Sequence, residues 1–242
     1  MTTREHICRT SVWALALIPL LALAQVTTSI EEVKQKADAG DRQAQFRLGS
    51  AYDSGTGVPR DGAEAMKWYL RAAEAGYAEA QNSVGSGLQA EKRYEEARIW
   101  YERAAAQGHA LAINNLAYLH DLGLGVKQDR QKGFDLYNRA ADLGWAEAMW
   151  NLANMYGAGQ LGEKDLDMAC VWTFRAVRFV NPKDRQRFAP AFRAAGFFER
   201  QLPAERLSAC KQKSEAWMPS AMITQKDAQQ DAVGDAKKAA RP

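Results

Sequence analysis

The chain has 242 residues, of which 47% are hydrophobic and 25% are charged, and only seven are prolines. Its 32 basic and 29 acidic residues alternate along the chain and give a formal net charge of +3, which argues against a nucleic-acid-binding surface. This composition favours one long helical array.

Residues 1–24 have the order of a secretory signal peptide. Arg4 and Arg9 precede the apolar run 12–24, which closes on the small residues Ala22 and Ala24. That run has 13 residues, whereas a membrane-spanning helix needs about 20. We therefore expect cleavage after Ala24 and a periplasmic or secreted protein with no integral membrane segment. A retained membrane anchor is the alternative.

Residues 25–39 are predicted to form an N-terminal capping helix. Ser29 and Glu32 have the spacing of a capping box, in which each side chain bonds the backbone N–H of the other residue. Such a helix would cover the apolar edge of whatever follows it.

Residues 40–179 contain four copies of one motif. The copies are 40–75, 76–107, 108–143 and 144–179, and each begins with a glycine. A regular repeat of this length is typical of stacked helical hairpins. The copies align in columns: small residues stand at Ala44, Ala80, Ala112 and Ala148, and larger apolar residues follow one helical turn later at Leu48, Val84, Leu116 and Leu152.

The second half of each copy has a similar pair of columns. Large residues stand at Trp68, Trp100, Leu136 and Trp172, and alanines follow four residues later at Ala72, Ala104, Ala140 and Ala176. The large side chain would fill the space between two paired helices, and the small one would let their backbones approach.

Glycines and aspartates mark the turns within copies one and three. Gly55 and Gly57, like Gly123 and Gly125, are predicted to adopt positive φ and end the first helix. Asp61 and Asp129 suit the start of the second helix. The second copy is four residues shorter and lacks the glycine pair, so its turn should be shorter.

With these columns in place, the repeats resemble the Sel-one-like repeat family, which is related to the tetratricopeptide repeats. The first copy matches the family pattern at Ala44, Leu48, Gly49, Tyr52, Gly55, Gly57, Val58, Ala65, Trp68, Tyr69, Ala72, Ala73 and Gly76. The fourth copy departs from it, with Leu161 at the second loop glycine. The resemblance implies an all-α fold, a right-handed α/α superhelix of four helical hairpins with N- and C-terminal capping helices.

After the repeats, residues 180–218 are predicted to form C-terminal capping helices at about 184–201 and 203–217, with Pro190 shortening or kinking the first. Residues 219–242 are rich in Ala, Gln, Lys and Asp and are predicted to be a disordered tail.

Candidate chemical groups are few, and no cofactor or metal is expected. Cys170 and Cys210 would form a disulfide in an oxidising compartment or remain two buried thiols. His120 stands in the column held by Tyr52 and Tyr156, which favours a structural role. Ser208 and Lys211 fit the S-x-x-K motif of serine β-lactamases, but the partner motifs S-D-N and K-T-G are absent.

The candidate binding surface lies on the first helix of each repeat, which lines the concave side in solenoids of this kind. Its residues vary between copies and are mostly polar: Arg47, Ser83, Asn115 and Asn151 in one column, and Ser50, Ser86, Tyr118 and Asn154 three residues later. Trp150 is a candidate binding hot spot if it is exposed. A solvated inner face without a partner is the alternative.

The resemblance implies a non-enzymatic interaction module, a periplasmic adaptor or scaffold that binds a peptide or protein on the concave face. The alternative is an immunity or inhibitor protein that neutralises a secreted toxin such as a phospholipase, as some members of the family do. A β-lactam-type hydrolase, an activity linked to some cysteine-rich relatives, is less favoured.

Overall fold

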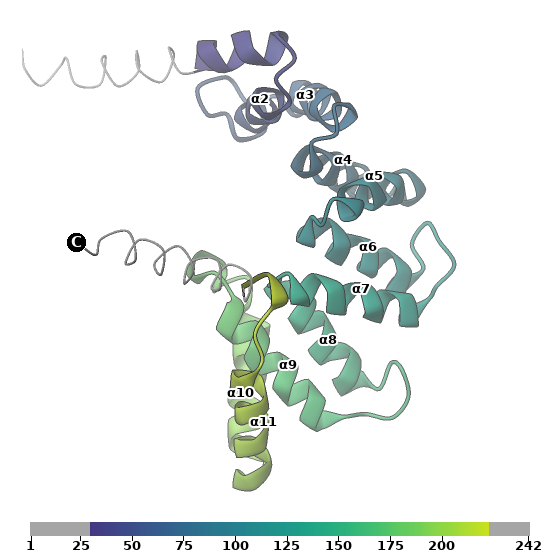
Figure 1. Ribbon diagram of the computed structural model, residues 1–242, viewed down its shortest axis with the longest axis vertical. Coiled ribbons are helices and arrows are strands. Elements are labelled where there is room, and N and C mark those ends of the chain that lie inside the picture. The colour runs from purple at the N-terminus through teal and green to yellow at the C-terminus, as the bar shows by residue number, and fades with distance from the viewer. Residues whose placement is uncertain (1–29, 223–242) are drawn as a thin grey trace, which may run out of the picture. The chain divides into compact units, whose positions relative to one another are not determined.

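The computed structural model describes residues 30–222 (Figure 1). The predicted signal peptide, and most of the predicted tail, lie outside these residues. The described part of the chain is built of α-helices with one short 3₁₀ helix and contains no β-strand. The chain divides into two compact units, 1–84 and 85–242, with the boundary inside helix α4 (Ala78–Ala90).

The first unit is a helical hairpin covered at one edge by an earlier helix. Residues 30–38 are helical, followed by α2 (Arg42–Ser54) and α3 (Gly62–Glu74). Ala37 shares a core with Ala44, Leu48 and Trp68, and Ile30 and Val33 pack against that core. The helix over 30–38 thus buries apolar surface of the first repeat.

The second unit continues with α5 (Tyr94–Ala106), α6 (Ala110–Leu122), α7 (Arg130–Asp142), α8 (Ala146–Ala158) and α9 (Leu166–Phe179). Helices α6 and α7 pack as one hairpin and α8 and α9 as the next (Figure 1). The alanine columns explain this close pairing, since Ala72, Ala104, Ala140 and Ala176 are all completely buried within their own units.

The predicted turn chemistry is confirmed. Gly55, Gly57, Gly123 and Gly125 all have φ between 65° and 75°. Each of the aspartates Asp61 and Asp129 accepts hydrogen bonds from backbone N–H groups at the start of its helix, as do Asp41 and Asp165.

The turn of the second copy is short, as predicted. Helix α4 ends at Ala90 and α5 begins at Tyr94. Lys92 takes the left-handed conformation there, with φ of 61°, where the other copies use glycine.

The C-terminal region departs from prediction in two places. The helix expected from 184 begins only at Ala189, because Pro190 stands in its first turn and cannot donate to a preceding turn; α10 is Ala189–Gln201, and a 3₁₀ helix, Pro182–Asp184, precedes it. Helix α11 is Ala204–Ala216.

The prediction of disorder from residue 219 is wrong for the first four residues of that segment. Pro219 is buried, residues 220–222 are helical, and the Ser220 hydroxyl donates to the Asp142 carbonyl oxygen at 3.1 Å. Residues 219–222 are thus ordered by contacts with the end of α7, which the composition of the segment does not indicate.

Candidate functional site

In the first unit, the residues of the predicted binding columns differ in their exposure. Arg47 and Ser50 are exposed on α2. Ser83 is half-buried, and its hydroxyl donates to the Glu79 carbonyl oxygen of its own helix at 3.0 Å. The Ser83 hydroxyl is therefore occupied within α4.

In the second unit, three predicted residues meet in one hollow. This first hollow has a volume of about 270 Å³ and is lined by Ser86, Gln89, Ala90, Tyr94, Tyr101, Asn115, Tyr118 and Leu124. Ser86 comes from α4, whereas Asn115 and Tyr118 lie one helical turn apart on α6. Its lining has several hydrogen-bonding groups and no charged side chain.

Tyr101 fixes the inner wall of the first hollow. Its side chain is 1% exposed; its hydroxyl donates to Gln89 Oε1 at 2.9 Å and shares a second hydrogen bond with the Ser86 hydroxyl at 3.3 Å. Burial raises the pKa of the Tyr101 hydroxyl, and the bond to Ser86 opposes that rise. Tyr101 therefore stays protonated at neutral pH and remains a donor, while Tyr118, 39% exposed, presents its ring at the surface.

A second hollow lies between α8, α9 and α10. Its volume is about 370 Å³, and its lining is largely apolar: Trp150, Ala153, Asn154, Gly157, Ala158, Gln160, Leu166, Ala169, Thr173, Ala194 and Phe198. Trp150 and Asn154 of the predicted set lie here. Asn151 does not, and its amide donates to Asn114 Oδ1 at 3.1 Å, which ties α8 to α6.

The sequence interpretation missed the tyrosine column. Tyr69, Tyr101 and Tyr137 each follow the large residue of the second helix, and Thr173 takes that place in the fourth repeat. In the second repeat the hydroxyl of this tyrosine bonds Ser86, which lies in one of the predicted binding columns. Comparing the residue next to the tryptophan column across the four copies would have revealed it.

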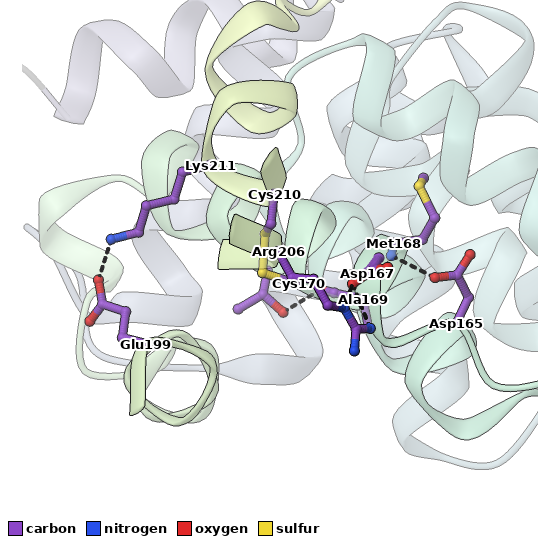
Figure 2. The surroundings of a disulfide bond; sticks show 10 residues. Asp165, Asp167, Met168, Ala169, Cys170, Glu199, Arg206, Cys210 and Lys211 are labelled. Carbon is purple, nitrogen blue, oxygen red and sulfur yellow. Dashed lines mark hydrogen bonds and ion pairs between the residues drawn. A yellow bond between two sulfur atoms is a disulfide. The ribbon is translucent and has the colours of Figure 1, made fainter. Parts of the chain in front are cut away.

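Cys170 and Cys210 form a disulfide between α9 and α11 (Figure 2). The S–S distance is 2.01 Å and the Cα atoms are 6.1 Å apart. Arg206 pairs with Asp167 and Lys211 pairs with Glu199, each at 2.7 Å (Figure 2). The disulfide and its neighbouring ion pairs hold α11 against α9 and α10.

No group of three or more His, Cys, Asp or Glu side chains in residues 30–222 could hold a metal ion. Lys211 is engaged by Glu199, and Ser208 is exposed on α11.

His120 is buried at the end of α6, with 6% of its surface exposed. This burial agrees with the predicted structural role. Neither of its ring nitrogens has a hydrogen-bond partner within the described part of the chain. Burial lowers the pKa of its imidazole, and nearby Lys132 lowers it further.

None of the helices between residues 30 and 222 is both long and apolar enough to cross a membrane.

The paired helices, glycine turns and alanine columns define an all-α helical-repeat protein. The sequence profile of the Sel1 repeat matches residues 42–77, 78–109, 110–145 and 146–178. The chain therefore belongs to the Sel1 repeat family, whose repeats are typically non-catalytic protein-interaction modules.

Among solved structures, the chain is similar to c5321, a protective antigen present in uropathogenic Escherichia coli strains, with a TM-score of 0.69 and 29% identity. The match covers 81% of this chain and 43% of that one. Human eukaryotic elongation factor 2 kinase is 28% identical over 134 residues, which are 54% of this chain and 16% of the kinase.

The secretory immunoglobulin A-binding protein EsiB of Escherichia coli is 42% identical over 57 residues, 24% of this chain and 11% of EsiB. The chain thus spans less than half the length of each of these three relatives.

Proposed function

We propose that this chain is a non-enzymatic adaptor, periplasmic or secreted, that binds an extended segment of a partner protein at the first hollow. The observation that carries this proposal is the convergence of Ser86, Asn115 and Tyr118 from two helices onto one hollow whose inner wall is Tyr101. Variable residues on an invariant helical frame are the usual means by which repeat proteins select partners.

The chemistry of the hollow indicates what kind of segment fits. Because no charged side chain lines it, a charged group placed there would lose its hydration without gaining a counter-ion. The Asn115 amide offers both donor and acceptor groups, which suits a peptide backbone. The rings of Tyr94 and Tyr118 offer apolar contact with a polar tip. An uncharged stretch of extended chain is chemically compatible with all of these groups.

Two features support an exported location. The predicted signal peptide at residues 1–24 would direct secretion. The disulfide between Cys170 and Cys210 is of a kind that persists in oxidising compartments such as the periplasm. EsiB, which is 42% identical to this chain over 57 residues, is by its name a secretory immunoglobulin A-binding protein.

The test is affinity capture from a periplasmic extract with the full chain as bait. Asn115→Ala and Tyr118→Ala should each weaken the captured partner's affinity by about tenfold or more, because truncating a hot-spot side chain typically costs at least 1 kcal/mol. Ile99→Ala is the matched control, since Ile99 is similarly exposed (42%) and does not line the hollow. Equal affinity for all variants would remove the first hollow as the docking site.

The same affinity-capture experiment distinguishes an adaptor function from an inhibitor function. An adaptor leaves its partner's activity unchanged on binding. A captured hydrolase or toxin whose activity falls in proportion to complex formation would instead establish the immunity role.

A further inference from the structure

Helix α10 has one exposed face that combines positive charge with an aromatic ring. Arg193, Phe197 and Arg200 are exposed and stand four and three residues apart, which places them on the same side of the helix. The buried side of α10 consists of Ala191, Ala195 and Phe198. The three exposed side chains, which we call the α10 face, are therefore directed toward solvent.

Phe197 is the apolar centre of the α10 face. With 53% of its surface accessible, it is the most exposed large hydrophobic residue among residues 30–222. Its ring lies edge-on to the buried ring of Phe198, with the two centroids 5.8 Å apart. Because this contact restricts the Phe197 side chain, less conformational entropy is lost when a partner packs against its outer side.

The two arginines on either side of Phe197 have no counter-ion. Neither Arg193 nor Arg200 forms an ion pair or hydrogen bond with any residue that the structure describes. Glu199 is the one acidic residue of α10, and Lys211 pairs with its carboxylate at 2.7 Å (Figure 2). The Arg200 guanidinium lies over Gly196, where an added Cβ would be 3.2 Å from its Nη1 atom. Both guanidinium groups are thus available to a ligand.

Charge and spacing indicate the chemistry of that ligand. A guanidinium group forms paired hydrogen bonds with a carboxylate. Arg193 and Arg200 are separated by about 10 Å along the helix axis, and Phe197 lies between them. An acidic segment with an apolar side chain between its carboxylates matches this order. Arginine and aromatic residues are also enriched at the centres of protein interfaces.

A membrane surface matches the α10 face less well. A helix that lies on a membrane inserts a broad apolar face, whereas the apolar side of α10 is buried within the protein. Segments that bind anionic lipids typically carry about four to eight basic residues, and the α10 face has only Arg193 and Arg200.

We propose that the α10 face binds an acidic segment of a partner protein. Arg193 and Arg200 pair with its carboxylates, and Phe197 contacts an apolar side chain between them. The site is separate from the first hollow, which has no charged lining and no residue from α10. It gives the proposed adaptor a second surface of different chemistry, and it rests on that function only for the source of the segment.

The probe is the acetylated and amidated peptide Glu-Glu-Leu-Glu-Glu, titrated into the full-length, disulfide-bonded protein. Two-dimensional NMR follows the backbone amides of α10 and the Nε–H groups of its arginines. The expected result is a saturable shift of these signals. The uncharged peptide Gln-Gln-Leu-Gln-Gln should give no saturable shift. Glu-Glu-Gly-Glu-Glu should bind about threefold more weakly than the leucine peptide, because it buries less apolar surface.

Substitutions on the α10 face separate the contribution of charge from that of the ring. Arg193→Gln and Arg200→Gln should each weaken binding about threefold, and together about tenfold, as expected for exposed ion pairs. Phe197→Ala should remove the preference for the leucine peptide over the glycine peptide. All three side chains are exposed, so these variants should fold. Arg47→Gln, which removes the same charge from an exposed arginine of α2, is the matched control and should bind as the wild type does.

Wild-type affinity in the double arginine variant, or no response of α10 to the acidic peptide, would overturn the proposal. Vesicles of phosphatidylglycerol and phosphatidylcholine test the alternative ligand. Vesicle binding that the double variant loses, without peptide binding, would identify the α10 face as a membrane contact instead. None of these results bears on affinity capture by the Asn115→Ala and Tyr118→Ala variants, so the two proposals fail independently.

Discussion

At the scale of single residues, the two helices of each of the first three hairpins approach each other at a glycine, which is on the first helix in two repeats and on the second helix in the third. In the first two repeats it is on the first helix, at Gly49 and Gly85. In the third, the first helix has Ala117 and the glycine is Gly133 on the facing helix, where an added Cβ would lie 3.1 Å from the Asp121 Cβ. The rings of Tyr69 and Tyr101 lie against Gly49 and Gly85, and the fourth repeat, which has Thr173 in place of the tyrosine, has alanine at both glycine positions.

Gly85→Ala should therefore destabilise the protein. The new Cβ would lie 2.7 Å from the ring of Tyr101, which is buried and hydrogen-bonded, so the ring cannot move away freely. Overpacking of this kind costs about 1 to 3 kcal/mol. Urea unfolding measures it, with Gly62→Ala as the control, because a Cβ there meets nothing within 4 Å. A loss no larger than that of the control would show that Tyr101 is not held in place.

His120 should make stability depend on pH just below neutrality. Burial lowers the pKa of its imidazole below the usual 6.5, so between the lowered pKa and 6.5 the unfolded chain binds more protons than the native one. The free energy of unfolding therefore falls as the pH is reduced through that window. Each unit by which the pKa is lowered corresponds to about 1.4 kcal/mol.

The measurement is the free energy of unfolding at pH 7.5 and 5.5 in the wild type and in His120→Tyr, which restores the tyrosine of the equivalent column. The variant should lose less stability between the two values. Burial of Asp121 raises the pKa of its carboxyl above 3.8 and acts in the opposite direction. Asp121→Asn in both backgrounds removes that contribution. Identical slopes for wild type and His120→Tyr would show that His120 is accessible to protons without local opening.

At the scale of helices, the repeat columns were enough to predict the hairpins. The packing columns and the turn residues indicate the same helix boundaries. Gly123, for example, both ends α6 and has the expected positive φ. The start of α10 was misplaced because Pro190 fits either a kink within a helix or the first turn of a later one. Phe188 and Ala191 share a core with Ala146 of α8, a long-range contact that the local sequence does not indicate.

The hollows were harder to predict than the helices. The residues Ser86, Asn115 and Tyr118 were identified from their variability between copies, and the structure places them around one hollow. Asn151 looked equivalent in sequence, yet it is used in a bond to Asn114. The second hollow takes part of its lining from Ala194 and Phe198 of α10, which lies outside the repeats, so the repeat columns alone do not indicate it.

At the scale of the whole molecule, the disulfide belongs to one of the two compact units. It joins α9 to α11, both in the unit 85–242. Helix α11 buries few side chains of its own, chiefly Cys210 and Ser214. Its other attachments are the packing of Leu207 against the same core and polar contacts such as the Arg178 guanidinium, which donates to the carbonyl oxygens of Ser214, Glu215 and Trp217. The covalent link should therefore contribute strongly to the attachment of α11.

Breaking that link should destabilise one unit and spare the other. In a repeat array, stability is approximately a sum of each repeat and its nearest-neighbour contacts, so loss of the bond should act on α9 and α11 and leave α2 and α3 unchanged. Removing a disulfide typically costs about 2 to 4 kcal/mol. Hydrogen exchange of the backbone amides, compared between oxidised protein, protein treated with a reducing agent, and the Cys170→Ser, Cys210→Ser double variant, measures both regions at once. The reduced wild type controls for the new hydroxyl groups. Equal acceleration of α2 and α9 amides would mean that the chain unfolds as a single cooperative body.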